Sequence, residues 1–390
     1  MIRVKILHPF HFPDPFMIRS VLFKQAAFGV TSRPTVSANR TSLMGRRLSL
    51  SLLFLAAILP WVRSVNAEEA VLNLYSARHY QTDEALYANF SKATGIRVQR
   101  IEAGDEALLA RLRSEGRNSP ADIILLTDAS RLWKAQSEGL FQPLQSATLE
   151  RRIPVELRSH DTGKGSEWFG FSKRARMIVY DKSKIRPEQL TRYEDLANPA
   201  FKGQVCVRSA SHPYMLSLIG SMIEHLGETQ AEIWARGVVA NLARVPRGGD
   251  TDQIKGVSSG ECTIALTNSY YFVRMLRSKD PAERESAQKL GILWPNQATR
   301  GTHVNIAGGG IAQFAPHRDK AVRFLEYLAS DAAQSFFAEG NNEWPVVAGV
   351  VLNNPELEAL GTFKADTLPV ERIGQAQGAA QRLIDRAGWR

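Results

Sequence analysis

Two adjacent tyrosines, Tyr270 and Tyr271, stand directly after the apolar run 262–266, at the predicted start of a helix. Aromatic side chains that build a hydrophobic core usually recur at the spacing of a strand or a helix. An adjacent pair at the junction between two elements does not fit that spacing. The pair therefore raises the question of what two neighbouring phenol groups do at this point of the chain.

Similar polar aromatic side chains follow two other predicted strands at the point where each strand ends. Ligands of open α/β sheets bind beyond the carboxyl ends of the strands, so two facing lobes would bring these side chains around one cleft. Four of the nine tyrosines of the chain, and one histidine, share this position. They are His79 and Tyr80 after the predicted strand 71–75, Tyr214 after 204–209, and Tyr270 and Tyr271 after 262–267.

The chemistry that such a cluster offers is the binding of a hard, highly charged cation. A neutral phenol, with a pKa of about 10, is a poor metal ligand, and only a strongly polarising cation keeps several phenolates ionised at neutral pH. Zn²⁺ favours Cys and His, whereas Mg²⁺ and Ca²⁺ prefer carboxylates, carbonyls and water. Fe³⁺ is the common ion that matches several tyrosinates. The alternative for each tyrosine is a half-buried packing residue, and the adjacent pair also suits a domain interface.

The pattern from residue 70 onward alternates short aliphatic runs with amphipathic stretches. This alternation predicts a mostly parallel sheet with helices on both faces. Extended runs at 167–171, 177–180 and 301–312 predict two crossings between domains. The other predicted strands are 96–101, 122–126 and the end of 238–245, and the predicted helices are 83–93, 106–114, 129–138, 215–226, 252–258 and 317–339.

Three consecutive glycines occupy positions 308–310. They do not open a helix after a strand in the G-x-G-x-x-G form, so a dinucleotide site is a poor interpretation. Close packing of the backbone, or a bend between lobes, explains them better.

The length and charge of the chain limit its class. A chain of 390 residues exceeds the usual size of a single core, so we expect two domains. The formal net charge of +10 would suit a nucleic-acid partner, but residues 1–67 carry +8 of it and leave +2 for 68–390. We therefore expect no nucleic-acid partner.

Residues 44–67 have the form of a signal peptide, with a basic head, an apolar run at 48–62 and a small residue at the end. The run is shorter than the roughly 20 residues that a spanning helix needs, although an uncleaved anchor is the alternative. We expect cleavage after Ala67, with Val65 at the third position back. Residues 1–43 look like a non-native or mis-assigned extension, with translation beginning at Met44.

The chain has two cysteines, Cys206 and Cys262, and both lie in β-branched runs that could form neighbouring strands. In the oxidising compartment that a signal peptide implies, they could form one disulfide. The alternative is a pair of buried free thiols that pack as small apolar side chains. No spacing of Cys and His suggests zinc.

Several motifs connect the chain with a known family. The most specific are LYSARHY at 74–80 and NSYY at 268–271, and the stretches 168–181, 246–252 and 341–345 mark a wider class of two-lobed binding proteins. Across 70–347 the chain resembles the periplasmic ferric-iron-binding proteins of bacterial ABC importers, particularly the cyanobacterial type. The resemblance implies an α/β fold of the type II Venus-flytrap kind, with two lobes joined by two crossover strands. The implied lobes are 68–166 with 300–347, and 167–299 with 348–390.

The resemblance also implies the ligands of the metal. Tyr80 would come from the first lobe, and Tyr214, Tyr270 and Tyr271 from the second. His79 matches a position that binds iron in some members of the family and not in others.

Two arginines and a proline qualify this ligand set. Arg274, one helical turn after Tyr270, and Arg174 or Arg176, near the first crossing, would help to keep the phenolates ionised. Pro213 departs from the family pattern and restricts the backbone before Tyr214.

The function that the resemblance implies is that of a non-enzymatic, exported carrier of Fe³⁺. It would act in the periplasm as a monomer and deliver the ion to an ABC permease in the inner membrane. The alternative is the same two-lobed scaffold with a small organic solute or an oxyanion, which the tyrosines would stack on or hydrogen-bond. A redox metalloenzyme is a poor interpretation, because the sequence supplies no obvious acid/base pair. A serine hydrolase is a poor interpretation as well, because the sequence has no G-x-S-x-G motif.

Overall fold

The computed structural model describes residues 70–78 and 80–390. The predicted extension 1–43, the predicted signal peptide 44–67 and the predicted ligand His79 lie outside the described residues. Within the described part, no helix is both long and apolar enough to span a bilayer.

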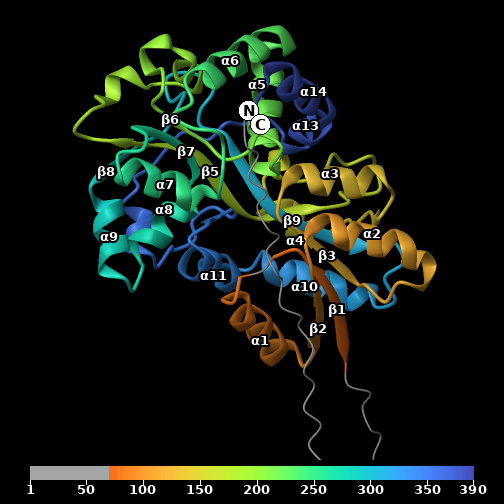
Figure 1. Cartoon of the computed structure of the whole chain (residues 1–390). Helices are drawn as coiled ribbons and strands as arrows, with labels where there is room; N and C mark the ends of the chain where they lie inside the picture. The colour runs from red at the N-terminus through yellow and green to blue at the C-terminus, as the bar shows by residue number, and fades with distance from the viewer. Residues whose placement is uncertain (1–69, 79) are drawn as a thin grey trace, which may run out of the picture. The chain divides into compact units, whose positions relative to one another are not determined.

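The strands follow the order β2 (Arg97–Glu102), β1 (Val71–Ser76), β3 (Ile123–Leu126), β9 (Val304–Ala312), β5 (Phe169–Asp181), β7 (Ile264–Asn268) and β6 (Val205–Cys206) (Figure 1). The first three are parallel. Helices alternate with these first strands, which confirms the predicted βα pattern. Strand β3 is buried along its whole length, as expected for a strand that helices cover on both faces. The elements are β1 (Val71–Ser76), α1 (Asp83–Thr94), β2 (Arg97–Glu102), α2 (Asp105–Glu115), β3 (Ile123–Leu126) and α3 (Ala129–Ser137).

One long strand, β5 (Phe169–Asp181), joins two parts of this sheet. Its first half pairs with β9 (Val304–Ala312), and its second half pairs with β7 (Ile264–Asn268) and β8 (Leu290–Leu293), all antiparallel. The two predicted aromatic runs are therefore one strand. With β9, it forms the two crossings that the sequence predicts.

The second part of the sheet repeats the strand-then-helix order. Strand β6 (Val205–Cys206) is parallel to β7, and it is shorter than the predicted 204–209. The helices of this part are α5 (Pro213–Leu226), α6 (Glu228–Ala240), α7 (Asp250–Ser258), α8 (Ser269–Leu276) and α9 (Pro281–Gln288).

Two sequence predictions need correction. The run 238–245 begins inside α6, and its strand-like end supplies only one bridge, between Leu242 and Val205. The single helix predicted over 317–339 is two helices, α10 (Arg318–Leu328) and α11 (Asp331–Asn341). The helix is interrupted because the Ser330 hydroxyl caps a new start by accepting a hydrogen bond from the amide of Ala333.

The three glycines at 308–310 allow β9 to approach its neighbours closely. A Cβ atom at Gly309 would overlap the carbonyl oxygen of Ile124, and one at Gly308 or Gly310 would overlap another backbone oxygen. Close backbone packing is therefore the correct interpretation of this triplet.

The hydrophobic core has separate clusters for the two parts of the sheet. One cluster surrounds β1, β3 and the start of β5, and the others surround the end of β5 and β7. Cys206 and Cys262 are joined by a disulfide, with their Cα atoms 5.9 Å apart. The remaining elements are β4 (Phe141–Gln142), α4 (Ala147–Arg152), β10 (Trp344–Pro345), α12 (Pro355–Glu358), α13 (Val370–Gln375) and α14 (Gln377–Ala387).

Candidate metal site

The adjacent tyrosines lie at the start of α8, which begins directly after β7. Asn268 is the N-cap of this helix, so Tyr270 and Tyr271 occupy its first turn. Tyr270 is only 3% exposed, and its ring packs against that of Tyr271 with centroids 4.2 Å apart. The end of a buried strand and the start of a helix thus hold both phenols at the edge of the sheet.

Tyr214 joins this pair from α5, where it follows Pro213 in the first turn. Proline is favoured at this first helical position, so Pro213 helps to start the helix. The imidazole of His212 caps the helix by accepting a hydrogen bond from the amide of Tyr214 at 3.2 Å. The hydroxyl of Tyr270 donates a hydrogen bond to the phenol oxygen of Tyr214 at 3.2 Å.

Tyr80 reaches the same place from the loop after β1. Its ring lies edge-on to that of Tyr270, with centroids 6.3 Å apart and planes at 85°. The structure therefore brings together four of the five predicted ligands: Tyr80, Tyr214, Tyr270 and Tyr271. The fifth, His79, is outside the described residues.

Burial keeps Tyr80, Tyr214 and Tyr270 protonated in the absence of a metal. It raises the pKa of Tyr80 and Tyr270 well above the usual value, and the negative charge of Glu343 adds to the effect at Tyr80. Burial also raises the pKa of Tyr214 to about 12, even though Arg174 opposes the rise. A cation must therefore be strongly polarising to displace these protons at neutral pH.

Arginines surround the tyrosines. The guanidinium of Arg174 lies 5.1 Å from the ring centroid of Tyr214, and that of Arg274 lies 4.8 Å from the ring centroid of Tyr271. Arg174 is buried, whereas Arg274 is exposed and donates to the hydroxyl of Thr251. Arg174 and Arg274 are thus in contact with a predicted ligand, whereas Arg176, the other arginine near the crossing, pairs with Asp250.

Two further arginines contact the tyrosines, and neither was predicted from the sequence. Arg78 lies 5.0 Å from the ring centroid of Tyr80, and Arg208 lies 5.1 Å from that of Tyr214. Arg78 belongs to the LYSARHY motif, and Arg208 follows β6, so their positions beside Tyr80 and Tyr214 were available signals.

Carboxylates balance the charge of the buried arginines. Arg78, Arg174, Arg176 and Arg208 each lie within 4 Å of at least one buried acid, so these four positive charges face four negative ones. An additional positive ion must then be neutralised by the phenol oxygens. The pairs are Arg78 with Asp83 at 2.8 Å, Arg174 with Asp128 at 3.8 Å and with Glu343 at 3.9 Å, and Arg176 and Arg208 with Asp250 at 2.5 and 3.3 Å.

Asp250 also positions the adjacent tyrosines. Its carboxylate accepts a hydrogen bond of 2.7 Å from the amide of Asn268, the N-cap of α8. Arg176, on β5, pairs with the same carboxylate and donates to the side chain of Asn268 at 3.2 Å. The start of α8 is therefore tied to the crossing strand.

Carboxylate, imidazole and thiol groups do not offer an alternative metal site in the part of the chain described. No three His, Cys, Asp or Glu side chains among residues 70–78 and 80–390 are placed to hold an ion. The phenol cluster is thus the remaining candidate there.

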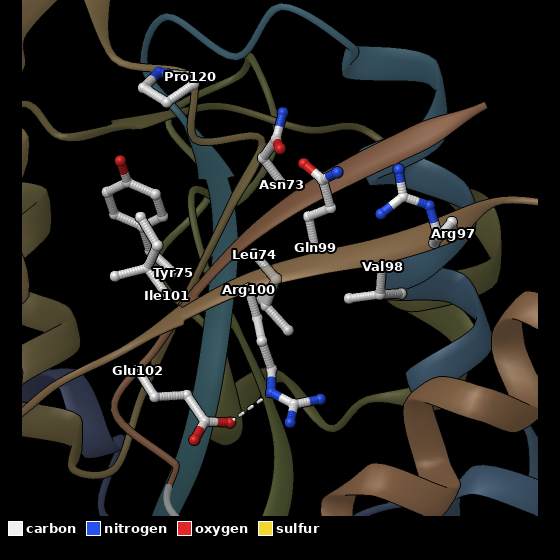
Figure 2. A pocket seen from close by; sticks show the side chains of 10 residues that line it. All are labelled: Asn73, Leu74, Tyr75, Arg97, Val98, Gln99, Arg100, Ile101, Glu102 and Pro120. Atoms are coloured by element: carbon white, nitrogen blue, oxygen red, sulfur yellow. Dashed lines mark ion pairs between the residues drawn. The ribbon is translucent and has the colours of Figure 1, made fainter. Parts of the chain in front are cut away.

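A separate cavity of about 790 Å³ opens at the edge strand β2 (Figure 2). It is lined by residues of β1 and β2, and Arg100 pairs with Glu102 on the same strand at 2.7 Å. None of the predicted ligands lines this cavity. The tyrosines are therefore distinguished by the chemistry of their side chains and not by the volume of a cavity.

Residues 118–366 match the family of bacterial extracellular solute-binding proteins, which is 249 of the 390 residues. The chain belongs to this family. The solute-binding protein is 48% identical to iron uptake protein A1 of Synechocystis over 83% of this chain and 88% of that protein. It is also 26% identical to the Fe(3+)-binding periplasmic protein of Serratia marcescens, over 83% of this chain and 90% of that protein.

Solved structures agree with this assignment. The iron- and citrate-bound FutA (IdiA) of Trichodesmium has a TM-score of 0.79 and 50% identity, over 82% of this chain and 100% of that one. These similarities confirm the predicted resemblance and the predicted two-lobed α/β fold of the solute-binding protein.

Proposed function

We propose that the chain captures Fe³⁺ between its two lobes and delivers it to an ABC permease. The observation that carries the proposal is the position of Tyr270, whose phenol contacts Tyr80 from the first part of the sheet and Tyr214 from the second. The names of the relatives, iron uptake protein and Fe(3+)-binding periplasmic protein, support iron as the solute.

The ligands in this proposal are Tyr80, Tyr214, Tyr270 and Tyr271, with His79 as a further candidate next to Tyr80. Fe³⁺ displaces the phenol protons, and the resulting phenolates neutralise its charge, because the buried arginines and acids already balance each other. Arg174 and Arg274 lie beside the rings and lower the cost of each phenolate.

The chain acts as a carrier and not as an enzyme, in the periplasm, as a monomer that meets an inner-membrane permease. Its lobes are 68–166 with 300–347, and 167–299 with 348–390, and β5 and β9 connect them. Hinge closure between such lobes is the usual motion of this fold class.

The test is the colour of the iron complex. Tyrosinate-to-iron charge transfer gives a visible absorption band, so ferric iron buffered with nitrilotriacetate should colour the purified chain. The double variant Tyr270→Phe and Tyr271→Phe should lose this band and weaken iron binding by about a thousandfold or more. Tyr180→Phe, a control outside the cluster, should keep both. A colourless wild-type complex, or an unchanged band in the double variant, would contradict the proposal.

A further inference from the structure

A second pocket lies against the crossing strand β5, away from the tyrosines. Its volume is about 430 Å³, and Lys173, Trp344, Leu352, Leu357 and Phe363 are among its lining residues. This volume is in the range of pockets for small organic ligands.

The walls of the pocket are aromatic and packed. Trp294 stacks on Phe363 with ring centroids 4.4 Å apart, and Trp344 lies edge-on to Phe363 at 5.2 Å. Trp344 also pairs directly with Lys173 in the antiparallel register of β10 and β5. The lysine therefore lies next to flat apolar surfaces.

The far wall of the pocket is held in place by hydrogen bonds. The indole of Trp294 donates to the carbonyl of Leu360 at 3.0 Å, and the amide of Lys364 donates to the side chain of Gln297 at 2.7 Å. The amide of Thr302 donates to the carbonyl of Lys364 at 2.8 Å. The pocket is thus formed without a ligand, which reduces the ordering cost of binding one.

Lys173 places a positive charge in this apolar pocket. Among residues 70–78 and 80–390, nothing accepts a hydrogen bond from its ammonium group or pairs with it within 4.0 Å. Burial lowers the pKa of Lys173, and the charge of Glu156 opposes this only in part. Lys173 is half-buried, so an anion in the pocket would give its ammonium group a partner from the apolar side. Glu358 also lines the pocket, but it is exposed to solvent at the rim.

The pocket is distinct from the tyrosine cluster. Successive side chains of a strand point to opposite faces, so Lys173 and Arg174 face opposite sides of β5. Arg174 contacts Tyr214, which places the pocket behind the strand from the phenols.

We propose that this pocket binds a small carboxylate with an aromatic or similarly flat apolar body. The carboxylate pairs with the ammonium of Lys173, and the body packs against Trp344 and Phe363. A cationic ligand would suit aromatic walls alone, but the charge of Lys173 repels it.

The experiment uses 4-fluorobenzoate as the probe and ¹⁹F NMR of the iron-free chain as the readout. We expect saturable binding with a Kd of about 1 mM, and about tenfold weaker binding for the uncharged 4-fluorobenzyl alcohol. Lys173→Met removes the charge but keeps an apolar stem, and it should weaken binding of the carboxylate about tenfold or more. Lys202→Met, at an exposed lysine, is the matched control and should bind like the wild type.

Several outcomes would overturn the proposal. They are the absence of saturable binding, equal binding of the alcohol and the carboxylate, and unchanged binding in Lys173→Met. Comparison of the two probes needs no variant, so the test stands even if Lys173→Met folds poorly. Loss of binding in Tyr270→Phe but not in Lys173→Met would place the probe at the tyrosines and also reject the pocket.

Discussion

The phenol of Tyr270 donates a hydrogen bond of 3.2 Å to the phenol of Tyr214, although 56 positions separate the two residues. Each phenol lies in the first turn of its own helix, one after β7 and the other after β6. The contact joins two βα turns of the same sheet. The ring of Tyr80 contacts that of Tyr270 from a third βα turn. The proposed binding of Fe³⁺ depends on this contact, because it brings the phenols of all three turns together.

Iron binding should release protons and weaken as the pH falls. Burial raises the pKa of Tyr80, Tyr214 and Tyr270, so each phenol is protonated at neutral pH in the empty site and loses its proton to Fe³⁺. We expect about three to four protons per ion, and a tenfold change in affinity per pH unit for each proton released. Calorimetry in buffers of different ionisation enthalpy measures the number. Release of one proton or none would contradict phenolate ligation.

Removal of Arg174 should harm both stability and iron binding. Arg174→Met leaves Asp128 and Glu343 buried without this partner, which should cost about 3–5 kcal/mol of unfolding free energy in urea titrations. It should also weaken iron binding at least about tenfold, because a positive charge beside Tyr214 is lost. Arg236→Met, at an exposed pair with Glu232, should change stability by less than about 1 kcal/mol. Equal effects of the two variants would argue against a role for Arg174 at the site.

Reduction of the disulfide should destabilise the chain measurably. Cys206 and Cys262 enclose a separation of 56 residues, for which loop-closure entropy predicts about 4 kcal/mol. Urea unfolding with and without a reductant measures the difference. The double variant Cys206→Ala and Cys262→Ala should be insensitive to the reductant. If the wild type were insensitive as well, the bond would not contribute to stability.

A methyl group at Gly309, in the crossing strand β9, should destabilise the chain. The Cβ of Gly309→Ala would overlap the carbonyl oxygen of Ile124 on β3, so we expect a loss of about 1–3 kcal/mol. Gly104→Ala is the control, because nothing lies within 4 Å of its added Cβ and its φ of −62° suits any residue. A similar stability for both variants, measured by thermal unfolding, would show that β9 can shift away from β3.

Much of this arrangement follows from local patterns in the sequence. The apolar run before Tyr270 predicts a strand, and the helical spacing after it predicts a helix, so the tyrosine must lie at the edge of the sheet. The same logic places Tyr80 and Tyr214. The prediction that these turns converge on one site came from the general rule for α/β sheets and from the family resemblance.

Other features depend on contacts between distant residues and could not be predicted. Arginine is common at protein surfaces, so the closeness of Arg78 to Tyr80 and of Arg208 to Tyr214 in the sequence is too weak a signal to mark either arginine as a neighbour of a phenol. Asp250 binds the amide of Asn268 across 18 positions, and no periodicity predicts that bond. The break at Ser330 was locally visible as a capping residue, but the continuous apolar stripe on either side of it concealed the break.

The continuity of β5 has a consequence for unloading. Arg174 belongs to the half of the strand that pairs with β9, whereas Arg176 belongs to the half that pairs with β7, and only Ala175 lies between them. A twist of the strand at this point would carry the guanidinium of Arg174 away from the ring of Tyr214, which is anchored on α5. The phenol would then regain its affinity for a proton just as the cleft admits water, so mechanical opening and chemical discharge of the ion would be one event.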